Sequence, residues 1–199
     1  MSTTQPIRNM ETLQNFKEYY KKQKKNLRNY TIIILGLNTA LRINDLLHLT
    51  YNDVYRNNQV RDHIIVKERK TGKENRILLN QESRSILEIY QKELIKTKMY
   101  QNGNPYLFPS PRKNDAPLSR YQAYRMITAA AKAVGIEEHI SCHSLRKTFG
   151  YHAWKQGYEP VVLMAIFNHT SFNVTRRYLC IEQDDKDIVY RDIYRMPAA

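Results

Sequence analysis

Apolar residues follow a helical period along most of this chain and a two-residue period along one short part of it. Spacings of three and four residues indicate amphipathic helices, whereas alternation indicates strands. The segment 29–38 is apolar nearly all round, so we expect its helix at the centre of the fold. The expected helices cover residues 11–25, 29–38, 81–96, 120–134, 141–156 and 160–167, a short segment that Asn173 caps and that carries Tyr178, and an amphipathic tail from residue 183.

Residues that begin and end helices stand at the borders of these segments. Asn80 and Ser119 precede two of them, and both residue types cap a helix N-terminus through a side-chain oxygen. Gly135 follows the last apolar position of its helix, where glycine commonly ends one. Pro160 suits a first helical turn, in which its missing N–H has no partner in any case. Asn168 tolerates left-handed backbone, so we expect it to end its helix and to aim the residue after it.

The alternating part of the chain predicts a β-hairpin. Residues 63–66 and 75–79 are its arms, and 70–73 (Lys-Thr-Gly-Lys) form its tip. Residues 101–117 contain several prolines and are expected to be a long loop. The predicted fold class is therefore mainly α with a small antiparallel β-sheet (α+β). The expected organisation is a leader over 1–10, one domain over 11–182 and a tail helix over 183–199.

Charge narrows the class of partner. The 199 residues include 32 Lys and Arg against 19 Asp and Glu, a net charge of +13. A chain this basic usually binds a polyanion, and nucleic acid is the first expectation; the alternative is a solvated basic surface in a lysine-rich protein. The first eight residues lack the apolar core of a signal peptide, and no apolar run approaches the ~20 residues of a membrane span. We expect a cytoplasmic protein that is not bound to a membrane.

The cysteines suggest the same compartment. Cys142 and Cys180 are too few for a disulfide framework, which fits a reducing cytoplasm. A zinc site built from His139, Cys142 and His143 is an alternative, but no second Cys or His cluster completes it. The zinc site is therefore the weaker interpretation of these residues.

Side chains suited to phosphate chemistry lie close together near the C-terminal end, at His143, Arg146, His169 and Tyr178. His143 and Arg146 are three residues apart and share a face of their expected helix. A guanidinium can hold two phosphate oxygens and an imidazole can donate to a third. A phenol beside them could attack the phosphorus. The alternative for each residue taken alone is packing.

A charged pair lies inside an apolar stretch nearer the N-terminus. Arg42 and Asp45 are three residues apart, and their neighbours are Leu and Ile. The simple interpretation is a surface ion pair. The apolar neighbours instead predict burial, and a buried arginine is uncommon without a function.

Taken in order, these groups resemble the catalytic set of the tyrosine recombinases, the phage integrase family. The matching set is Arg42, Lys70, His143, Arg146, His169 and Tyr178, with Asp45 as the supporting acidic residue. The motifs carrying it are 39–47, 70–73, 143–146 and 168–178, and the resemblance covers about residues 12–181. Lys70 is the better match for the catalytic lysine of the hairpin. Where the family commonly has Leu-Gly, this chain has Phe167-Asn168.

The resemblance implies a site-specific recombinase or integrase that cuts and rejoins DNA strands. Tyr178 would attack the scissile phosphate and form a 3′-phosphotyrosine, which conserves the bond energy, so that neither ATP nor a metal is needed. Arg42 and Arg146 would hold the phosphate, and the two histidines would add donors. Lys70 would protonate the leaving 5′ oxygen.

The resemblance also implies partners. Double-stranded DNA is the substrate, and the family's tail segment often packs on a neighbouring protomer. We thus expect a monomer in free solution and a homo-tetramer on two DNA sites, with an accessory DNA-binding protein as an option. About 40 residues precede Arg42, where most members carry a DNA-clamping domain. The chain therefore resembles short stand-alone members such as the fimbrial phase-variation recombinases, a truncated chain or a mobile-element fragment being alternatives.

Two other functions stay open at this point. A type IB topoisomerase would relax supercoiled DNA without a defined target site. A DNA-binding regulator would retain the fold without catalysis, although every catalytic position here carries the expected residue type.

Overall fold

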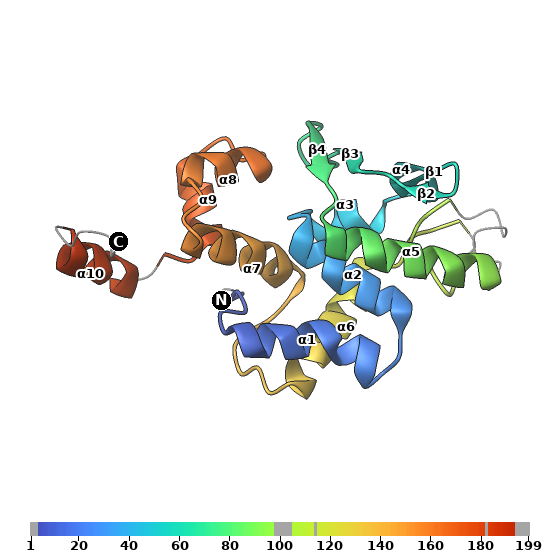
Figure 1. The fold of residues 1–199 in the computed structure, drawn as a ribbon, viewed down its shortest axis with the longest axis horizontal. Coiled ribbons are helices and arrows are strands. Elements are labelled where there is room, and N and C mark those ends of the chain that lie inside the picture. Colours follow the sequence, from blue (N-terminus) through green and yellow to red (C-terminus); the bar gives the residue numbers. More distant parts are fainter. Residues whose placement is uncertain (1–3, 98–104, 114, 182, 194–199) are drawn as a thin grey trace.

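The computed structural model describes residues 4–97, 105–113, 115–181 and 183–193, which fold into helices and two small antiparallel sheets (Figure 1). The helices are α1 (Met10–Lys22), α2 (Leu27–Asn38), α3 (Ile43–Leu47), α4 (Tyr51–Val54), α5 (Gln81–Lys96), α6 (Arg120–Ala133), α7 (Cys142–Lys155), α8 (Pro160–Ile166), α9 (Phe172–Leu179) and α10 (Gln183–Asp192). The strands are β1 (Tyr55–Arg56), β2 (Gln59–Val60), β3 (His63–Lys67) and β4 (Glu74–Leu78). This is the mainly helical α+β class that the sequence predicts. Within these described ranges, no helix is long and apolar enough to cross a bilayer.

Helix α2 lies at the centre of the fold, as predicted. Ile32, Ile33 and Ile34 are fully buried, and α1, α5 and α7 pack against the helix. The approach of α7 is close because Gly36 has no side chain. A Cβ atom at this position would lie 2.5 Å from the Cδ1 atom of Leu145. A larger residue at this glycine would therefore displace α7, which carries two of the candidate catalytic residues.

Strands β3 and β4 form the predicted hairpin. They pair along their whole length, from His63 opposite Leu78 to the end next to the turn. Alternate residues of β3 face the core, as a two-residue period requires. The Asn75 side chain donates a hydrogen bond of 3.1 Å to the carbonyl oxygen of Ile166 in α8. Figure 1 shows the hairpin rising from the body beside α3, on the same side of the molecule as α8.

The five signals at helix ends are each confirmed. The side chain of Asn80 caps α5 and that of Ser119 caps α6. Gly135 follows α6 with a φ of +75°. Pro160 is the first residue of α8. Asn168 follows α8 with a φ of +50°, the left-handed conformation expected of it.

Two predicted boundaries are wrong. The first helix was expected to reach residue 25 but ends at Lys22, and Asn26 already caps α2 with its side chain. The break between these helices therefore lies earlier than the pattern indicates. Asn173 was expected to cap the helix carrying the tyrosine, but Ser171 does so by accepting a hydrogen bond of 3.2 Å from the Asn173 N–H. Both residue types cap helices, and the earlier one takes the position here.

Several short elements between residues 43 and 60 have no counterpart in the predicted pattern. They are α3, α4 and the β1–β2 pair. Helix α4 is held by a reciprocal cap in which Thr50 and Asp53 bond to each other's backbone. Strands β1 and β2 are joined through Asn57 and Asn58, both with positive φ. Elements of two to five residues are too short to show a period, so hydrophobic spacing cannot reveal them.

The predicted loop over 101–117 lies partly outside the described residues, and its described part is anchored to the body. Leu107 donates a backbone hydrogen bond of 2.7 Å to the carbonyl of Leu49. Leu118 donates one of 2.7 Å to the carbonyl of Phe108. These bonds hold the start of α6 near α3, which places the N-terminal end of α6 close to Arg42.

Helices α7, α8 and α9 enclose a second, smaller core. Its buried members are Ala40, Leu163, Phe167 and Leu179. Helices α7 and α9 approach each other closely at Gly150. A Cβ atom there would lie 2.9 Å from the Phe167 ring and 3.2 Å from the carbonyl oxygen of Tyr178. The glycine thus lets the backbone of α9 lie directly on α7.

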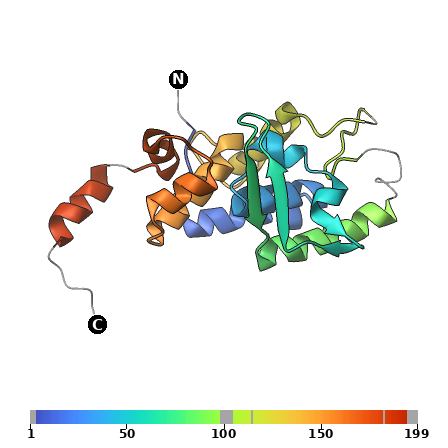
Figure 2. The same ribbon diagram turned by 90° about the horizontal axis from the view of Figure 1, so that it is seen from above.

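The tail helix α10 stands away from the rest of the fold (Figure 2). An ion pair of 2.5 Å between Lys155 of α7 and Asp185 connects the two. Its predicted apolar stripe is exposed: Ile188 is 43%, Val189 58% and Ile193 65% accessible. The stripe is therefore not packed against the body of the fold.

Candidate active site

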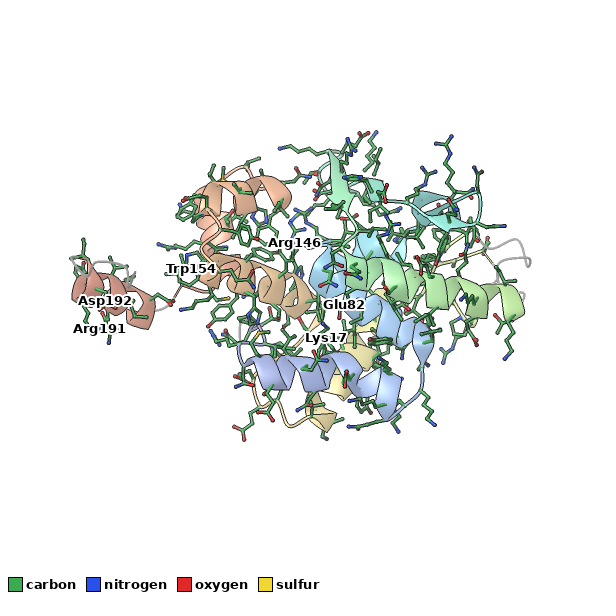
Figure 3. The ribbon with its side chains drawn as sticks, in the orientation of Figure 1. Lys17, Glu82, Arg146, Trp154, Arg191 and Asp192 are labelled. Carbon is green, nitrogen blue, oxygen red and sulfur yellow. The ribbon has the colours of Figure 1, made fainter. Side chains whose placement is uncertain are left out.

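The residues predicted from the sequence come from five separate parts of the fold. Arg42 immediately precedes α3 and Lys70 lies in the β3–β4 turn. His143 and Arg146 are on α7, His169 follows α8 and Tyr178 is on α9. Figure 3 shows Arg146 on the side of α7 that faces α3 and the hairpin.

Arg146 is the most deeply placed of these groups. Its side chain is only 1% accessible and donates hydrogen bonds to the carbonyl oxygens of Ala40 and Phe167, the latter at 2.6 Å. Ala40 has a φ of +54°, uncommon for a residue with a side chain, and its carbonyl points at the guanidinium. Burial, and then the charge of Arg42, lower the pKa of Arg146 to about 10. The group is still a cation at neutral pH.

Tyr178 lies beside this guanidinium. The carbon at the centre of the Arg146 guanidinium is 5.6 Å from the centre of the Tyr178 ring, and 4.7 Å from that of the Phe167 ring. The His169 ring centre is 4.9 Å from that of Tyr178. Tyr178 is half-buried and lines a cavity of about 680 Å³ together with His143, Arg177 and other residues. Tyr178 therefore lines a cavity that basic residues also line, and its ring packs against the neighbouring rings.

Both imidazoles are neutral at pH 7. His169 shares a hydrogen bond of 3.0 Å with the Thr175 hydroxyl through Nδ1. Burial, and then the charges of Arg146 and Arg42, lower the pKa of His169 to about 4. The pKa of His143 is also lowered, by burial and then by the charges of Arg120 and Arg146. Neutral imidazoles can accept a proton, which a cationic imidazole cannot.

Neutral His169 should make stability depend on pH. Its ordinary pKa is 6.5 and its folded pKa is about 4, so between these values the unfolded chain binds a proton that the folded chain excludes. The free energy of unfolding should fall as the pH drops through this window, by up to ~3 kcal/mol, and this histidine should add no pH dependence above it. Urea unfolding between pH 4 and 7.5 measures the slope. His169→Gln should flatten it, leaving the share of His143, whereas His139→Gln should not. An unchanged slope in His169→Gln would contradict the assignment.

Arg42 is held by a carboxylate that the sequence interpretation missed. It forms an ion pair with Glu68, whose side chain is 1% accessible. Burial acts to raise the pKa of Glu68, but hydrogen bonds from Thr71 and Arg42 and the charge of Arg42 outweigh it and hold the pKa below its usual range. Asp45 is buried, as predicted, and accepts a hydrogen bond of 3.0 Å from the Arg69 N–H. Its carboxylate thus bonds to the hairpin, while Arg42 forms its ion pair with Glu68.

A second, smaller cleft of about 230 Å³ lies next to Arg42 and the hairpin turn. Its lining includes Arg42, Arg69, Lys70, Arg120 and His143. His143 also lines the larger cavity beside the tyrosine. The imidazole therefore lies between the first arginine and the phenol. The cleft is strongly basic, which suits an anionic ligand.

The structure brings the predicted set together in two connected groups. Arg146, His169 and Tyr178 lie next to one another, and Arg42, Lys70 and His143 line the adjoining cleft. The residues not predicted are Glu68, Arg69, Arg120 and Thr175. In the sequence Glu68 lies within a run of charged residues that reads as a solvated turn, and Thr175 carries no signal. Across the described ranges, no three His, Cys, Asp or Glu side chains gather as a metal site would require, so His139, Cys142 and His143 do not form one.

Known proteins are similar to this chain over most of its length. The sequence model of the Phage integrase family matches residues 8–184. A probable integrase/recombinase, YoeC of Bacillus subtilis (strain 168), is 41% identical over 191 residues, 96% of this chain and 97% of that protein. The tyrosine recombinase XerC of Thermodesulfovibrio yellowstonii is 28% identical over 160 residues, 78% of this chain. The chain spans about half the length of this XerC relative, 50%.

Solved structures show the same fold. The crystal structure of XerA recombinase has a TM-score of 0.78 at 22% identity, covering 98% of this chain and 68% of that chain. The structure of XerH recombinase bound to a palindromic difH substrate, in a post-cleavage complex, also has a TM-score of 0.78, at 21% identity, covering 98% of this chain and 55% of that chain.

The fold and the neighbouring tyrosine, arginine and histidine define the class of the tyrosine recombinases. The chain belongs to the phage integrase family. The resemblance, the fold class and the enzyme class predicted from the sequence are thereby confirmed at the level of the family.

Proposed function

We propose that this chain is the catalytic domain of a site-specific DNA recombinase that cuts and rejoins strands through a 3′-phosphotyrosine. One observation carries the proposal: the Tyr178 ring lies in contact range of both Arg146 and His169, near a basic cleft that holds Arg42 and Lys70. A packing role for the tyrosine does not account for a buried guanidinium against its face. In this proposal the catalytic domain covers residues 11–182, and the tail helix follows it.

The first step forms one bond and breaks another. The Tyr178 oxygen attacks the scissile phosphorus, the new O–P bond forms and the bond from phosphorus to the 5′ oxygen breaks. Arg42 and Arg146 neutralise the charge that builds on the phosphate oxygens. The phenol proton passes to a neutral imidazole, and His169 is suited to it because its ring lies against the phenol. His143, between the cleft and the phenol, donates to or positions the phosphate.

Lys70 completes the step from the other side of the cleft. Its ammonium gives a proton to the leaving 5′ oxygen, so that a hydroxyl departs. The reverse sequence, with a 5′ hydroxyl from another strand as the attacking group, restores the phosphodiester and frees the tyrosine. Because the covalent intermediate keeps the energy of the broken bond, the cycle requires no ATP.

DNA is the proposed substrate on grounds of charge as well as fold. The net charge is +13, and the cleft that holds Arg42 and Lys70 is lined by cations from three parts of the fold. The XerH relative is described in complex with its DNA substrate. Binding of this chain should accordingly rest on phosphate contacts, each of which lowers log K by ~0.9 per log unit of salt.

Covalent trapping tests the proposal. A library of nicked duplexes with randomised sequence is incubated with the chain, and SDS-resistant adducts are isolated and their DNA sequenced. We expect adducts that share a sequence motif, with the chain attached to a 3′ phosphate. Relaxation of supercoiled plasmid with no shared motif would instead favour a type IB topoisomerase. Binding without any adduct would favour a non-catalytic DNA-binding regulator.

The tail provides the proposed route to assembly. The apolar stripe of α10 is exposed, and a separate groove of about 490 Å³ is lined by Phe149, Val162 and Ile166. A helix of this length does not gain enough from its own hydrogen bonds to be stable alone. The stripe of one copy packing on a neighbouring copy would link four protomers on two DNA sites, with a monomer in free solution.

Deleting residues 187–199 should separate cutting from recombination. The deletion removes the apolar stripe but leaves the site and its supporting helices intact. Single-site cleavage should therefore stay within a few-fold of the full chain, while exchange between two sites should fall by at least ~10-fold. The comparison uses the duplex recovered by trapping, and Val189→Asp serves as a variant of full length. Equal recombination by the truncated and full chains would show that the tail is not needed for assembly.

A further inference from the structure

The turn that carries Lys70 is organised around one residue, Glu68. The backbone N–H of Glu68 donates to the carbonyl of Lys73 at 2.8 Å, and the N–H of Gly72 donates to the carbonyl of Glu68 at 2.8 Å. The hydroxyl of Thr71 donates to the Glu68 carboxylate at 2.7 Å. Glu68 therefore contacts the turn through its N–H, its carbonyl and its side chain.

The burial of this carboxylate calls for an explanation. Glu68 is 1% accessible, although the residue before it and the residue after it are exposed. A buried carboxylate is costly unless it is paired and hydrogen-bonded. The pairing group here is the guanidinium of Arg42, which belongs to a different part of the fold. The carboxylate thus connects the turn of the hairpin to the first arginine of the site.

A second carboxylate fastens the same turn. Asp45 of α3 is 3% accessible and accepts the hydrogen bond of the Arg69 N–H. Arg69 and Thr71 are the two neighbours of Lys70, so the residues before and after the lysine are each held by a carboxylate. Lys70 itself is exposed and lines the cleft with Arg42. The backbone beneath the lysine is fixed while its ammonium remains free to reach a ligand.

We propose that Glu68 is a positioning residue that sets Lys70 against the phosphate clamp, by joining the hairpin turn to Arg42. This inference rests on the proposed function, since it concerns the proton that Lys70 gives to the 5′ oxygen. Glu68 does not touch the DNA in this proposal. It fixes the distance between the acid and the arginine, and a shift of about 1 Å in such a distance can cost ~10²-fold in rate.

Two other roles for Glu68 predict different results. If the carboxylate only orients Arg42, its loss weakens the hold on the phosphate whatever the leaving group is. If it only stabilises the fold, its loss lowers the unfolding temperature and reduces all activities together. Positioning of the acid alone makes the defect depend on whether the leaving atom needs a proton.

The experiment compares two leaving groups in the nicked duplex recovered by trapping. One substrate has the natural 5′ oxygen at the scissile phosphate, and the other has sulfur in that bridging position. A thiolate leaves without a proton, so the sulfur substrate bypasses the acid. Glu68→Ala should slow cleavage of the oxygen substrate by ~10–100-fold and cleavage of the sulfur substrate by less than ~3-fold. Lys70→Ala should show the same selectivity, and the double variant should be no worse than Lys70→Ala.

Two further variants test the interpretation independently of Glu68→Ala. Thr71→Val removes the hydroxyl that bonds Glu68 but keeps the ion pair, so it should show a smaller, sulfur-rescued defect even if Glu68→Ala fails to fold. Glu74→Gln changes an exposed carboxylate in the same hairpin and should cleave both substrates normally. Equal loss on both substrates in the Glu68 and Thr71 variants would overturn the positioning role. Failure of the unaltered chain to cleave either substrate would instead contradict the proposed function.

Discussion

Tyr178→Phe should abolish the SDS-resistant adduct with nicked DNA while leaving binding and stability unchanged. The substitution removes one oxygen and keeps the ring, so the contacts with Phe167, His169 and Arg146 remain. Loss of a nucleophile removes the covalent step outright, and we expect cleavage to fall by more than ~10⁴-fold. Adduct yield on the trapped duplex measures the chemistry. Gel shifts measure the affinity for DNA, and the midpoint of urea unfolding measures stability.

Two other tyrosines serve as matched controls. Tyr151 lies on α7 and Tyr190 on the exposed tail helix. Tyr151→Phe and Tyr190→Phe should form the adduct normally. An adduct that survives Tyr178→Phe but not one of these would assign the nucleophile to that residue. Normal cleavage by Tyr178→Phe would mean that the hydroxyl is not the nucleophile and that the side chain serves only packing.

Arg146→Lys should reduce cleavage by ~10²–10³-fold with little change in DNA affinity. Lysine keeps the charge but lacks the planar fork that reaches two carbonyl oxygens and a phosphate together. Arg146 is buried and bonded to Ala40 and Phe167, so the variant should also lose ~1–3 kcal/mol of stability. Rates must therefore be measured well below its unfolding midpoint. Arg42→Lys should lose comparable activity and less stability because Arg42 is more accessible.

An exposed arginine near the same cavity provides the control. Arg177 lies on α9 and lines the cavity beside the tyrosine. Arg177→Lys should cleave almost normally, since a surface lysine serves general attraction to phosphate equally well. If Arg146→Lys lost affinity and cleavage in the same proportion, Arg146 would serve DNA attraction or folding and not the transition state.

Most of the fold could be predicted because its signals are local. Helix periods and caps are properties of neighbouring residues, which is why Asn80, Pro160 and Asn168 are at their predicted places. The short elements around α3 and α4 escaped prediction because they depend on distant partners. Tyr51, for example, donates its backbone N–H to the carbonyl of Pro105. No spacing rule contains such a contact.

Part of the candidate site could likewise be predicted from the sequence, and part could not. The residue types and their order identify Arg42, Arg146 and Tyr178, and the structure brings them together, although their catalytic roles stay predictions. Glu68 could not be found from the sequence, because burial of one residue in a charged run depends on where α3 meets the hairpin. A run of charged residues in a sequence does not show which of its carboxylates is buried in the fold.

The close contact at Gly150 bears on which copy of the chain cuts which strand. Gly150 is one helical turn beyond Arg146 on α7, and the backbone of Tyr178 lies directly on it. Guanidinium and phenol therefore belong to one pair of helices in a single chain. In a mixed assembly, a copy lacking the hydroxyl and a copy lacking the guanidinium cannot complement each other, because no site holds both groups. Under the proposed function, we expect each copy to attack only the phosphate that its own arginines hold.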